Sequence, residues 1–363
     1  MKNYKRIIMA LAALAVAASC SDYLQTDNNL VRFSAGTGEP GTKASYSGQQ
    51  IDGRERVDWT VGDIMTIYCE ESPTPASHQS DYKIVGTPSS SGYYSVGSVE
   101  RRVGDIGLRW ADDETLVHHF YAVSPANYTN NSVSVRYNVG TQCAEYIGAV
   151  PATQAPKSVS ADANGNYTAA PDMLNLIMVA QVAQTKSESE TVTLDFKPVV
   201  TAVDFTIMNG YADQSAMTLS SIRLSSTSSD LFGGFSALYD DTESTEYASA
   251  GRTVEIPFSS PASVAYGKTL KFTVFLLGDE STTAADIDNL TIELITDATT
   301  SIQADLKTTQ GNITFPRSKK SYVTGLIVPG ACVWTISAEP DAVTAWGESS
   351  SNIDLGPQST TTP

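Results

Sequence analysis

The stretch that decides the fold runs from Val192 to Ile207 and reads VTLDFKPVVTAVDFTI. Apolar and polar residues alternate in its first part, at Val192, Leu194 and Phe196, and again in its second part, 203–207. A period of two residues is the pattern of a β-strand that buries one face and exposes the other. The stretch therefore predicts two consecutive strands.

The same alternation recurs along most of the chain, in short runs bounded by Gly, Pro, Ser, Asn or Asp. The other runs are 133–139, 254–258, 270–276 and 290–294. Helical periodicity is nearly absent, and the segment 174–182 reads either as one short helix or as a buried strand. Many short strands without intervening helices are typical of sandwiches or barrels rather than of a parallel α/β sheet. We predict an all-β protein with very little helix.

Turn signals and polar segments suggest how the chain is divided. Turns are expected at Asn209-Gly210, Gly233-Gly234 and Pro329-Gly330. The segment 184–190, QTKSESE, has no apolar residue and is the candidate boundary between two halves. The stretch 26–53 is polar and Gly-rich around one expected strand, Leu30 to Ser34, and the tail after Trp346 is mostly Ser, Thr, Gly and Pro.

The first twenty residues are typical of a bacterial lipoprotein signal. A basic head (Lys2, Lys5, Arg6) precedes an apolar run over 7–18, and Ser19-Cys20 follows. We expect signal cleavage between Ser19 and Cys20 and lipid attachment to the thiol of Cys20. An ordinary secretory signal is the alternative, whereas a spanning helix needs roughly 20 apolar residues and this run is shorter.

The charge balance excludes some partners. The chain has 23 Lys+Arg and 40 Asp+Glu. Removing the signal takes away three basic residues, which leaves 20 against 40 and a net charge of about −20. Nucleic acid and anionic lipid both require basic patches, so we expect neither as a partner.

Residue types that carry catalysis or bind metals form no specific pattern. Cys69, Cys143 and Cys332 remain beside Cys20, and they read either as buried apolar residues or as one disulfide pair and a free thiol. His118 and His119 are neighbours in an expected strand and point to opposite faces, so they cannot chelate one metal together. The calcium-loop-like stretch 162–166 lacks the required Gly and Glu and reads as a hairpin turn. We predict no enzyme, no metal and no cofactor.

Two further features could be either functional sites or ordinary parts of the fold. The match to G-x-G-x-x-G at 36–41 is followed by no helical stripe, so we read it as a loop rather than as a dinucleotide site. Aromatic residues could stack on sugars, with Tyr93-Tyr94 the best exposed candidate. For Phe120-Tyr121 and the four Trp residues (59, 110, 334, 346), core packing is the preferred reading.

Several segments, in order, resemble the fimbrillin-like lipoproteins of Bacteroidetes. The first is VDWTVGDIMTIY at 57–68, which contains Trp59, Gly62 and Asp63. The later ones are HFYAVSP at 119–125, PDML at 171–174, the stretch 192–207, the strand from 319 to Val-Pro at 328–329, and Trp346. Together they cover nearly the whole chain after the signal.

The resemblance implies two tandem transthyretin-like Greek-key β-sandwich domains and a role as a pilus subunit. It further implies delivery as a lipoprotein, removal of the first strand by a protease specific for Arg or Lys, and filling of the groove by a strand of a neighbouring subunit. Here the cut would follow Lys43, Arg54 or Arg56. The donor would come from the C-terminal region, where 332–336 alternates well and 352–355 weakly.

These expectations combine into one division of the chain. It has a signal peptide (1–19), a tether with the first strand (20–56), an N-terminal sandwich (57–187), a C-terminal sandwich (188–346) and a tail (347–363). The expected partners are other pilin subunits, the outer membrane through the lipid, and a host or glycan ligand. The rival hypothesis is a monomeric surface lipoprotein that binds glycans.

Overall fold

The computed structural model describes residues 29–36, 45–51, 54–73, 78–91, 94–126, 134–138, 143–189, 191–211, 213–238, 246–277, 290–296, 301–306, 319–328, 331–337, 347–349 and 353–354. Nearly all of its regular structure is β-strand, and the one helical turn among these residues is η3 (Met173–Asn175). No helix in these ranges is both long and apolar enough to cross a membrane. The predicted all-β class is confirmed.

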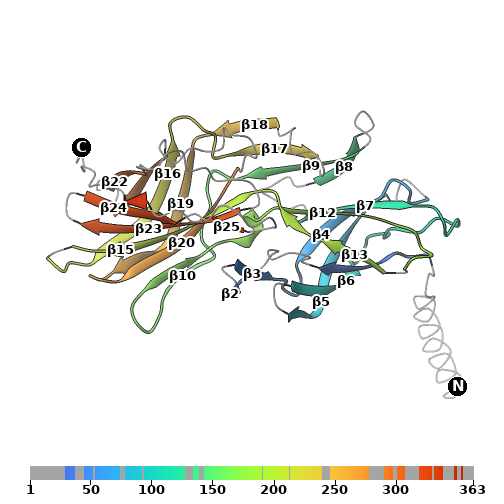
Figure 1. Cartoon of the computed structure of the whole chain (residues 1–363), viewed down its shortest axis with the longest axis horizontal. Helices are drawn as coiled ribbons and strands as arrows, with labels where there is room; N and C mark the ends of the chain where they lie inside the picture. Colours follow the sequence, from blue (N-terminus) through green and yellow to red (C-terminus); the bar gives the residue numbers. More distant parts are fainter. Residues whose placement is uncertain are drawn as a thin grey trace, which may run out of the picture.

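The first large sheet has eight strands, and Figure 1 shows it in the right-hand half of the molecule. Its order is β13 (Thr191–Asp195), β1 (Arg32–Gly36), β6 (Tyr94–Arg101), β5 (Gln79–Ser91), β4 (Ile64–Tyr68), β7 (His118–Ser124), β12 (Met178–Gln184) and β14 (Lys197–Pro198). Pro198 lies in the last strand of this order, which suits a residue that lacks an N–H to donate.

The second large sheet lies in the left-hand half of Figure 1. Its order is β10 (Ser158–Ala161), β11 (Tyr167–Ala170), β20 (Thr269–Leu276), β15 (Thr201–Asn209), β23 (Lys319–Val328), β24 (Ala331–Ser337) and β26 (Ile353–Asp354), and β25 (Gly347–Ser349) pairs with the start of β23.

Two four-stranded sheets and one ribbon complete the fold. One sheet has the order β19 (Thr253–Val264), β16 (Met217–Ser226), β21 (Leu290–Ile295) and β22 (Ser301–Leu306). The other has the order β18 (Glu246–Gly251), β17 (Phe232–Leu238), β9 (Cys143–Val150) and β8 (Ser134–Asn138). The ribbon pairs β2 (Ser45–Ile51) with β3 (Arg54–Asp58).

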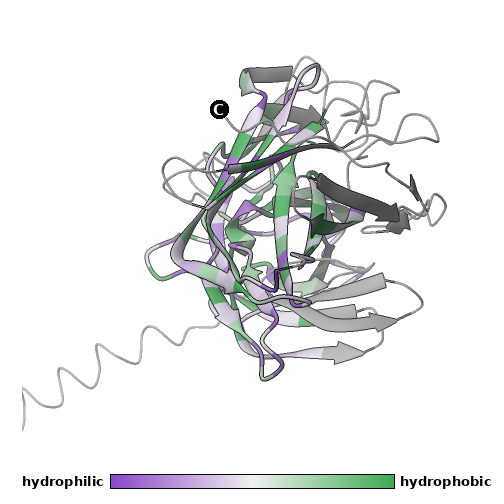
Figure 2. Ribbon diagram, turned by 90° about the vertical axis from the view of Figure 1, so that its left-hand side faces the viewer, coloured by the Kyte–Doolittle hydropathy of each residue, from purple (hydrophilic) through white to green (hydrophobic). Residues whose placement is uncertain are grey.

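The apolar faces of these sheets form two hydrophobic cores. The first core joins the first large sheet to the β8–β9–β17–β18 sheet, through side chains such as Tyr146 and Phe235. The second core lies between the second large sheet and the β16–β19–β21–β22 sheet, and Phe205 stacks on Phe272 in it. The alternation of apolar and polar residues along the strands is visible in Figure 2. Sheets that bury their apolar faces against each other make the architecture sandwich-like.

The stretch that predicted the fold passes from one core to the other. Val192, Leu194 and Phe196 are buried in the first core, and Val203, Phe205 and Ile207 in the second. All six alternating runs found in the sequence are strands in the structure: β8, β13, β15, β19, β20 and β21. The Greek-key connectivity and the division at residue 188 stay predictions.

Some local predictions need correction. Gly233-Gly234 is not a turn, because both residues lie inside β17 beside a bulge. Gly233 has a φ of +142°, and a Cβ there would lie 2.7 Å from the Cα of Ala250 on the neighbouring strand. The segment 174–182 begins as the turn η3 and continues as the strand β12. The first strand lies at Arg32–Gly36 rather than at Leu30 to Ser34.

Candidate functional site

Strand β1 lies inside the first large sheet, although it comes from the extreme N-terminal part of the described chain. Val31, Phe33 and Ala35 are buried at its core face, and Arg32 is exposed on the other side. This alternation is what a strand with one buried face requires. The residues of β1 therefore belong to the core of the sheet.

Two neighbouring strands hold β1 by main-chain pairing. It runs parallel to β13, from Arg32 opposite Thr191 to Gly36 opposite Asp195. On its other edge it runs antiparallel to β6, over four residue pairs. The pairing continues before the strand, where the N–H of Val31 donates to the carbonyl of Leu108 at 3.0 Å. Since β13 is the terminal strand of the sheet, β1 is its one ladder neighbour in the order of that sheet.

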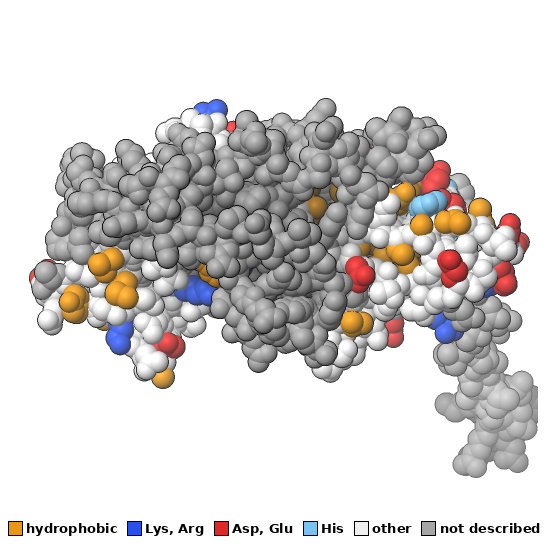
Figure 3. Space-filling model, in the orientation of Figure 1, with side chains coloured by type: hydrophobic (Ala, Val, Ile, Leu, Met, Phe, Trp, Pro, Cys, Tyr) orange, Lys and Arg blue, Asp and Glu red, His pale blue; other side chains and the backbone are white. Residues whose placement is uncertain are grey.

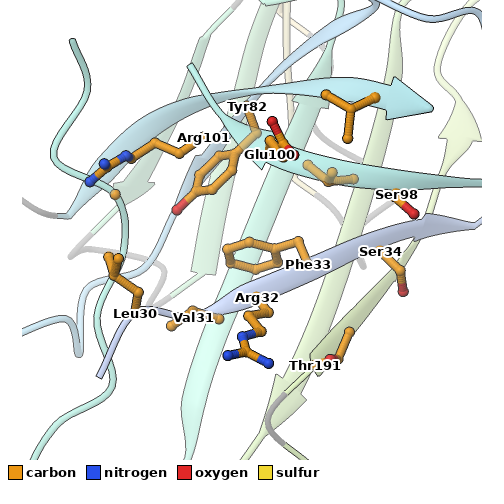
Figure 4. Close-up of a pocket in the computed structure, with 13 residues that line it drawn as sticks. Leu30, Val31, Arg32, Phe33, Ser34, Tyr82, Ser98, Glu100, Arg101 and Thr191 are labelled. Carbon is orange, nitrogen blue, oxygen red and sulfur yellow. The ribbon is translucent and has the colours of Figure 1, made fainter. Parts of the chain in front are cut away.

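Phe33 is the central apolar contact of β1. Its ring packs edge to face on Tyr82 at 4.9 Å and on Phe120 at 5.4 Å between centroids. A cavity of about 680 Å³ lies beside it, lined by residues of β1, β5, β6 and β13 and by Gly107. Figure 4 shows Phe33 and Tyr82 next to each other at this cavity, with Leu30 towards one end and Ser34 and Thr191 towards the other.

Two local features shape the surroundings of β1. The hydroxyl of Tyr82 accepts a hydrogen bond from the N–H of Leu108 at 2.8 Å, and burial raises the pKa of this phenol, so it stays neutral. Gly97 on β6 stands opposite Ala35, and a Cβ at Gly97 would approach Ile84 to 2.9 Å. The missing side chain at Gly97 therefore leaves room for the side chain of Ile84.

The arrangement is a binding slot for one extended segment. If β1 left, its neighbours β13 and β6 would present unpaired N–H and C=O groups, and the positions of Val31, Phe33 and Ala35 would be an open apolar trough. A segment with the same alternation satisfies both requirements at once. The sequence predicted the strand but not its partner β13, because pairing across about 160 positions leaves no trace in local periodicity.

The predicted processing residues lie partly outside this region. Ser19, Cys20 and Lys43 lie outside the described residues. Arg54 and Arg56 lie in β3, where Arg54 pairs with Ile51 of β2. No sequence pattern predicted this ribbon, because the stretch 45–58 is mostly polar.

The motif residues Trp59, Gly62 and Asp63 form a turn that starts β4. Trp59 is buried and packs edge to face on Phe196 at 5.3 Å. Gly62 has a φ of +94°, which favours glycine. The carboxylate of Asp63 accepts a hydrogen bond from the N–H of Thr60 at 2.9 Å. In this structure the motif fixes the entry into the first sheet and does not line the β1 slot.

The histidines have structural contacts. His118 is buried, its Nδ1 lies 3.0 Å from the carbonyl of Leu116, and its Nε2 accepts from the N–H of Ala111 at 3.1 Å. His119 points the other way, and its Nδ1 lies 2.7 Å from Glu71. The two neighbouring side chains thus lie on opposite faces of β7, as the strand pattern predicted.

Glu71 is positioned to make stability depend on pH. Burial alone raises the pKa of its carboxyl group, but hydrogen bonds from the N–H and the ring of His119 outweigh burial and lower it below the usual range. A lowered folded-state pKa stabilises the fold above the ordinary glutamate pKa, and this stabilisation is lost as the pH falls through the folded value.

We therefore expect Glu71→Gln to lower the free energy of unfolding at pH 7, by up to about 1 kcal/mol for a group that solvent partly screens. The difference from the wild-type protein should shrink towards zero at pH 3. Urea unfolding of both proteins at the two pH values measures it. A difference that is unchanged at pH 3 would contradict the role of the carboxylate charge.

Other candidates from the sequence have structural roles. Asp162 closes the hairpin between β10 and β11, where its carboxylate accepts from the N–H groups of Asn164 and Asn166, so the hairpin-turn reading is confirmed. Cys69 is a free, buried thiol, and burial raises its pKa. In the described ranges no three His, Cys, Asp or Glu side chains gather to hold a metal ion.

Most of the described aromatic residues that could have stacked on sugars lie in the hydrophobic core. Phe120, Tyr121, Trp59 and Trp110 are all buried, as the packing reading predicted. Tyr93 and Trp346 lie outside the described residues, as do the side chains of Tyr94 and Trp334. The buried aromatic side chains offer no surface for sugar stacking.

Comparison with known proteins relates the chain to others by structure. No protein-family model and no curated protein matches it. A solved structure of a putative cell adhesion protein from Bacteroides uniformis is similar, with 16% identity, a TM-score of 0.50, and coverage of 89% of this chain and 100% of that one. A second such protein, from Bacteroides ovatus, has 11% identity, a TM-score of 0.48, and coverage of 87% and 97%. A fimbrial assembly protein from Parabacteroides distasonis has 10% identity, a TM-score of 0.43, and coverage of 85% and 94%.

At this identity the likeness to the Bacteroides uniformis protein shows a common fold. The chain thus has the fold of a putative cell adhesion protein of Bacteroides uniformis, which is consistent with the fimbrillin-like family that its sequence motifs resemble.

Proposed function

We propose that this protein is a structural subunit of a cell-surface fimbria that serves adhesion and assembles by strand exchange. The observation that carries the proposal is the position of β1. It is an N-terminal strand held between β6 and β13 by pairing and packing, and it is followed by a polar stretch with Lys and Arg. The fold shared with the Bacteroides uniformis protein supports a role in adhesion.

In this proposal Cys20 carries the lipid that delivers the chain to the outer membrane, and proteolysis then separates β1 from the body. Among the candidate cut sites, Lys43 precedes the ribbon, whereas Arg54 and Arg56 lie in its strand β3. A cut after Arg54 or Arg56 requires the ribbon to open, because both residues are part of it. We therefore propose Lys43 as the preferred site.

The donor is the C-terminal region of a neighbouring subunit. Strand β24 pairs with β23 over seven residues, whereas β25 and β26 are held by three and two pairs. Releasing the segment that begins at Gly347 breaks the fewest ladder bonds of the described C-terminal strands. We propose that this segment, rather than β24, leaves its own subunit.

The energy of exchange is compatible with a durable joint. Each main-chain bond contributes roughly 1 kcal/mol net, and each fully buried large apolar side chain contributes about 1.5–3 kcal/mol. A strand that occupies the slot of β1 makes ladders on both edges and buries side chains at the positions of Val31, Phe33 and Ala35.

A nicked protein tests the proposal. Limited trypsin treatment should cut after Lys43 and leave the fragment with β1 bound under native conditions. A labelled peptide of residues 29–36 should then exchange into the slot, while the same peptide with Phe33→Asp should not. Size-exclusion chromatography of the labelled complex measures the exchange. The uncut protein is the control and should take up no peptide.

Two outcomes would contradict strand exchange. One is a nicked protein that loses its fragment and remains a stable monomer without taking up the peptide. The other is equal uptake of the wild-type and Phe33→Asp peptides, since this would show that the trough does not select its occupant.

A further inference from the structure

Exposed apolar side chains gather on one short segment of the chain. In the described ranges nine large hydrophobic residues are exposed, and four of them lie between positions 103 and 117. They are Val103, Ile106, Leu116 and Val117, with exposed fractions of 93%, 49%, 40% and 43%. Single exposed apolar residues are ordinary, but a cluster on one segment marks an interaction surface.

The strand register places all four at one end of the first sheet. Val103 and Ile106 follow the last residue of β6, Arg101, and Leu116 and Val117 precede the first residue of β7, His118. Because β6, β5, β4 and β7 pair antiparallel in turn, the end of β6 and the start of β7 lie at the same edge. We call this end the apolar tip. It is the right-hand end in Figure 3, where hydrophobic and acidic side chains lie together.

The described chain begins at the same end. The N–H of Trp110 donates to the carbonyl of Asn29 at 2.8 Å, and Leu30 bridges to Arg109. Lys186, on the next loop of this end, lies 3.2 Å from the side chain of Asn29 and pairs with Glu114. Asn29 is therefore fixed beside the segment that carries the exposed apolar residues.

Cys20 stands only nine positions before Asn29. A fully extended chain spans at most about 3.5 Å per residue, so the cysteine lies within about 30 Å of the tip. We propose that the apolar tip rests on the lipid surface that holds the acyl chains, with Val103 and its three apolar neighbours inserted at the headgroup boundary. This inference rests on the lipidation of Cys20 in the proposed function.

The charges of the tip select the kind of lipid surface. Asp112, Asp113 and Glu114 are exposed beside the apolar residues, and so are Arg101 and Arg102, so the tip has no basic excess that would attract anionic lipid. The chain without its signal has a net charge of about −20, which anionic lipid would repel and zwitterionic headgroups would not. The occupant is therefore a zwitterionic lipid surface. A second copy of the chain is the competing occupant that the experiment must separate.

Tryptophan replacements in the full-length lipidated protein test the contact. Val103→Trp reports from the tip, and Val61→Trp is the matched control, since Val61 is 57% exposed and lies at the opposite end of β4. Both proteins are bound to phosphatidylcholine vesicles with brominated acyl chains. Apolar groups at a membrane surface sit about 5–10 Å into the headgroup boundary, so the added emission of Val103→Trp should be quenched severalfold more than that of Val61→Trp.

The outcomes separate this inference from the proposed function. The mass of the N-terminal peptide reports lipidation independently, and an unmodified Cys20 would overturn both the anchor and the tip contact. Lipidated, vesicle-bound protein with equal quenching of the two variants would overturn the tip contact and leave the fimbrial proposal standing. Self-association of the lipid-free protein that Val103→Ser abolishes would assign the tip to a second copy instead.

Discussion

Replacing Phe33 with alanine should lower the free energy of unfolding by about 3–5 kcal/mol, the usual range for deleting a buried phenylalanine ring. Phe33 is 4% exposed, and the substitution removes the contacts of its ring with Tyr82 and Phe120. The space left behind joins the existing cavity of about 680 Å³. Urea unfolding at pH 7 measures the change.

Ser34 provides the matched control on the same strand. Its side chain points away from the core and lies 3.1 Å from the hydroxyl of Thr193. Ser34→Ala keeps every main-chain bond of β1, so it should change the free energy of unfolding by no more than about 0.5 kcal/mol. If Phe33→Ala cost as little as Ser34→Ala, β1 would not be an integral part of the core, and the slot would lose its physical basis.

The second large effect is expected at Lys320, which is buried opposite Asp204. The ammonium nitrogen lies 3.0 Å from a carboxylate oxygen, and both side chains are 1% exposed. Thr273 donates a hydrogen bond to the other oxygen of Asp204, at 2.5 Å. Lys320→Met leaves the buried carboxylate with only the partly exposed ammonium of Lys271 as its counter-charge, so it should lower the free energy of unfolding by up to about 3–5 kcal/mol.

Lys271 is the matched control for Lys320, because it pairs with the same carboxylate but is not buried. Its ammonium lies 3.3 Å from the same oxygen of Asp204, but its side chain is 46% exposed. Lys271→Met should therefore cost about 1 kcal/mol or less. The double variant Asp204→Leu with Lys320→Met removes both buried charges and should recover much of the stability, because apolar replacements of a buried pair are often neutral. A double variant no more stable than Lys320→Met would contradict an electrostatic origin of the loss.

The strands could be predicted because burial on one face leaves a period of two in the sequence. That signal located β13, β15, β19, β20 and β21. It failed for the ribbon of β2 and β3, since the mostly polar sequence 45–58 carries no period of two. The separate turn prediction at Gly233-Gly234 was wrong, because a bulge and a turn both favour glycine, and here Gly233 accommodates the close backbone of Ala250.

The candidate site depends on contacts between distant segments. A strand was expected at 30–34, but nothing local indicates that it pairs with β13 at Thr191. Likewise Asp204 and Lys320 occupy polar positions in alternating runs, where a solvent-exposed face is the ordinary expectation. Their burial and pairing join strands that are more than 100 positions apart, which local periodicity does not reveal. The motif at Trp59, Gly62 and Asp63 was easy to find, yet its contacts are those of a turn.

The double pairing of β1 has a mechanical consequence. A strand seated between β13 and β6 runs along both neighbours, so a force along its length loads the bonds of both ladders in shear. Such bonds must slip together, whereas an edge strand peeled from its end opens one bond at a time. Because the chain continues from β13 into β15 within a few residues, the load passes directly from the first core to the second. A fibre built through this slot would resist pulling along its axis far better than sideways peeling.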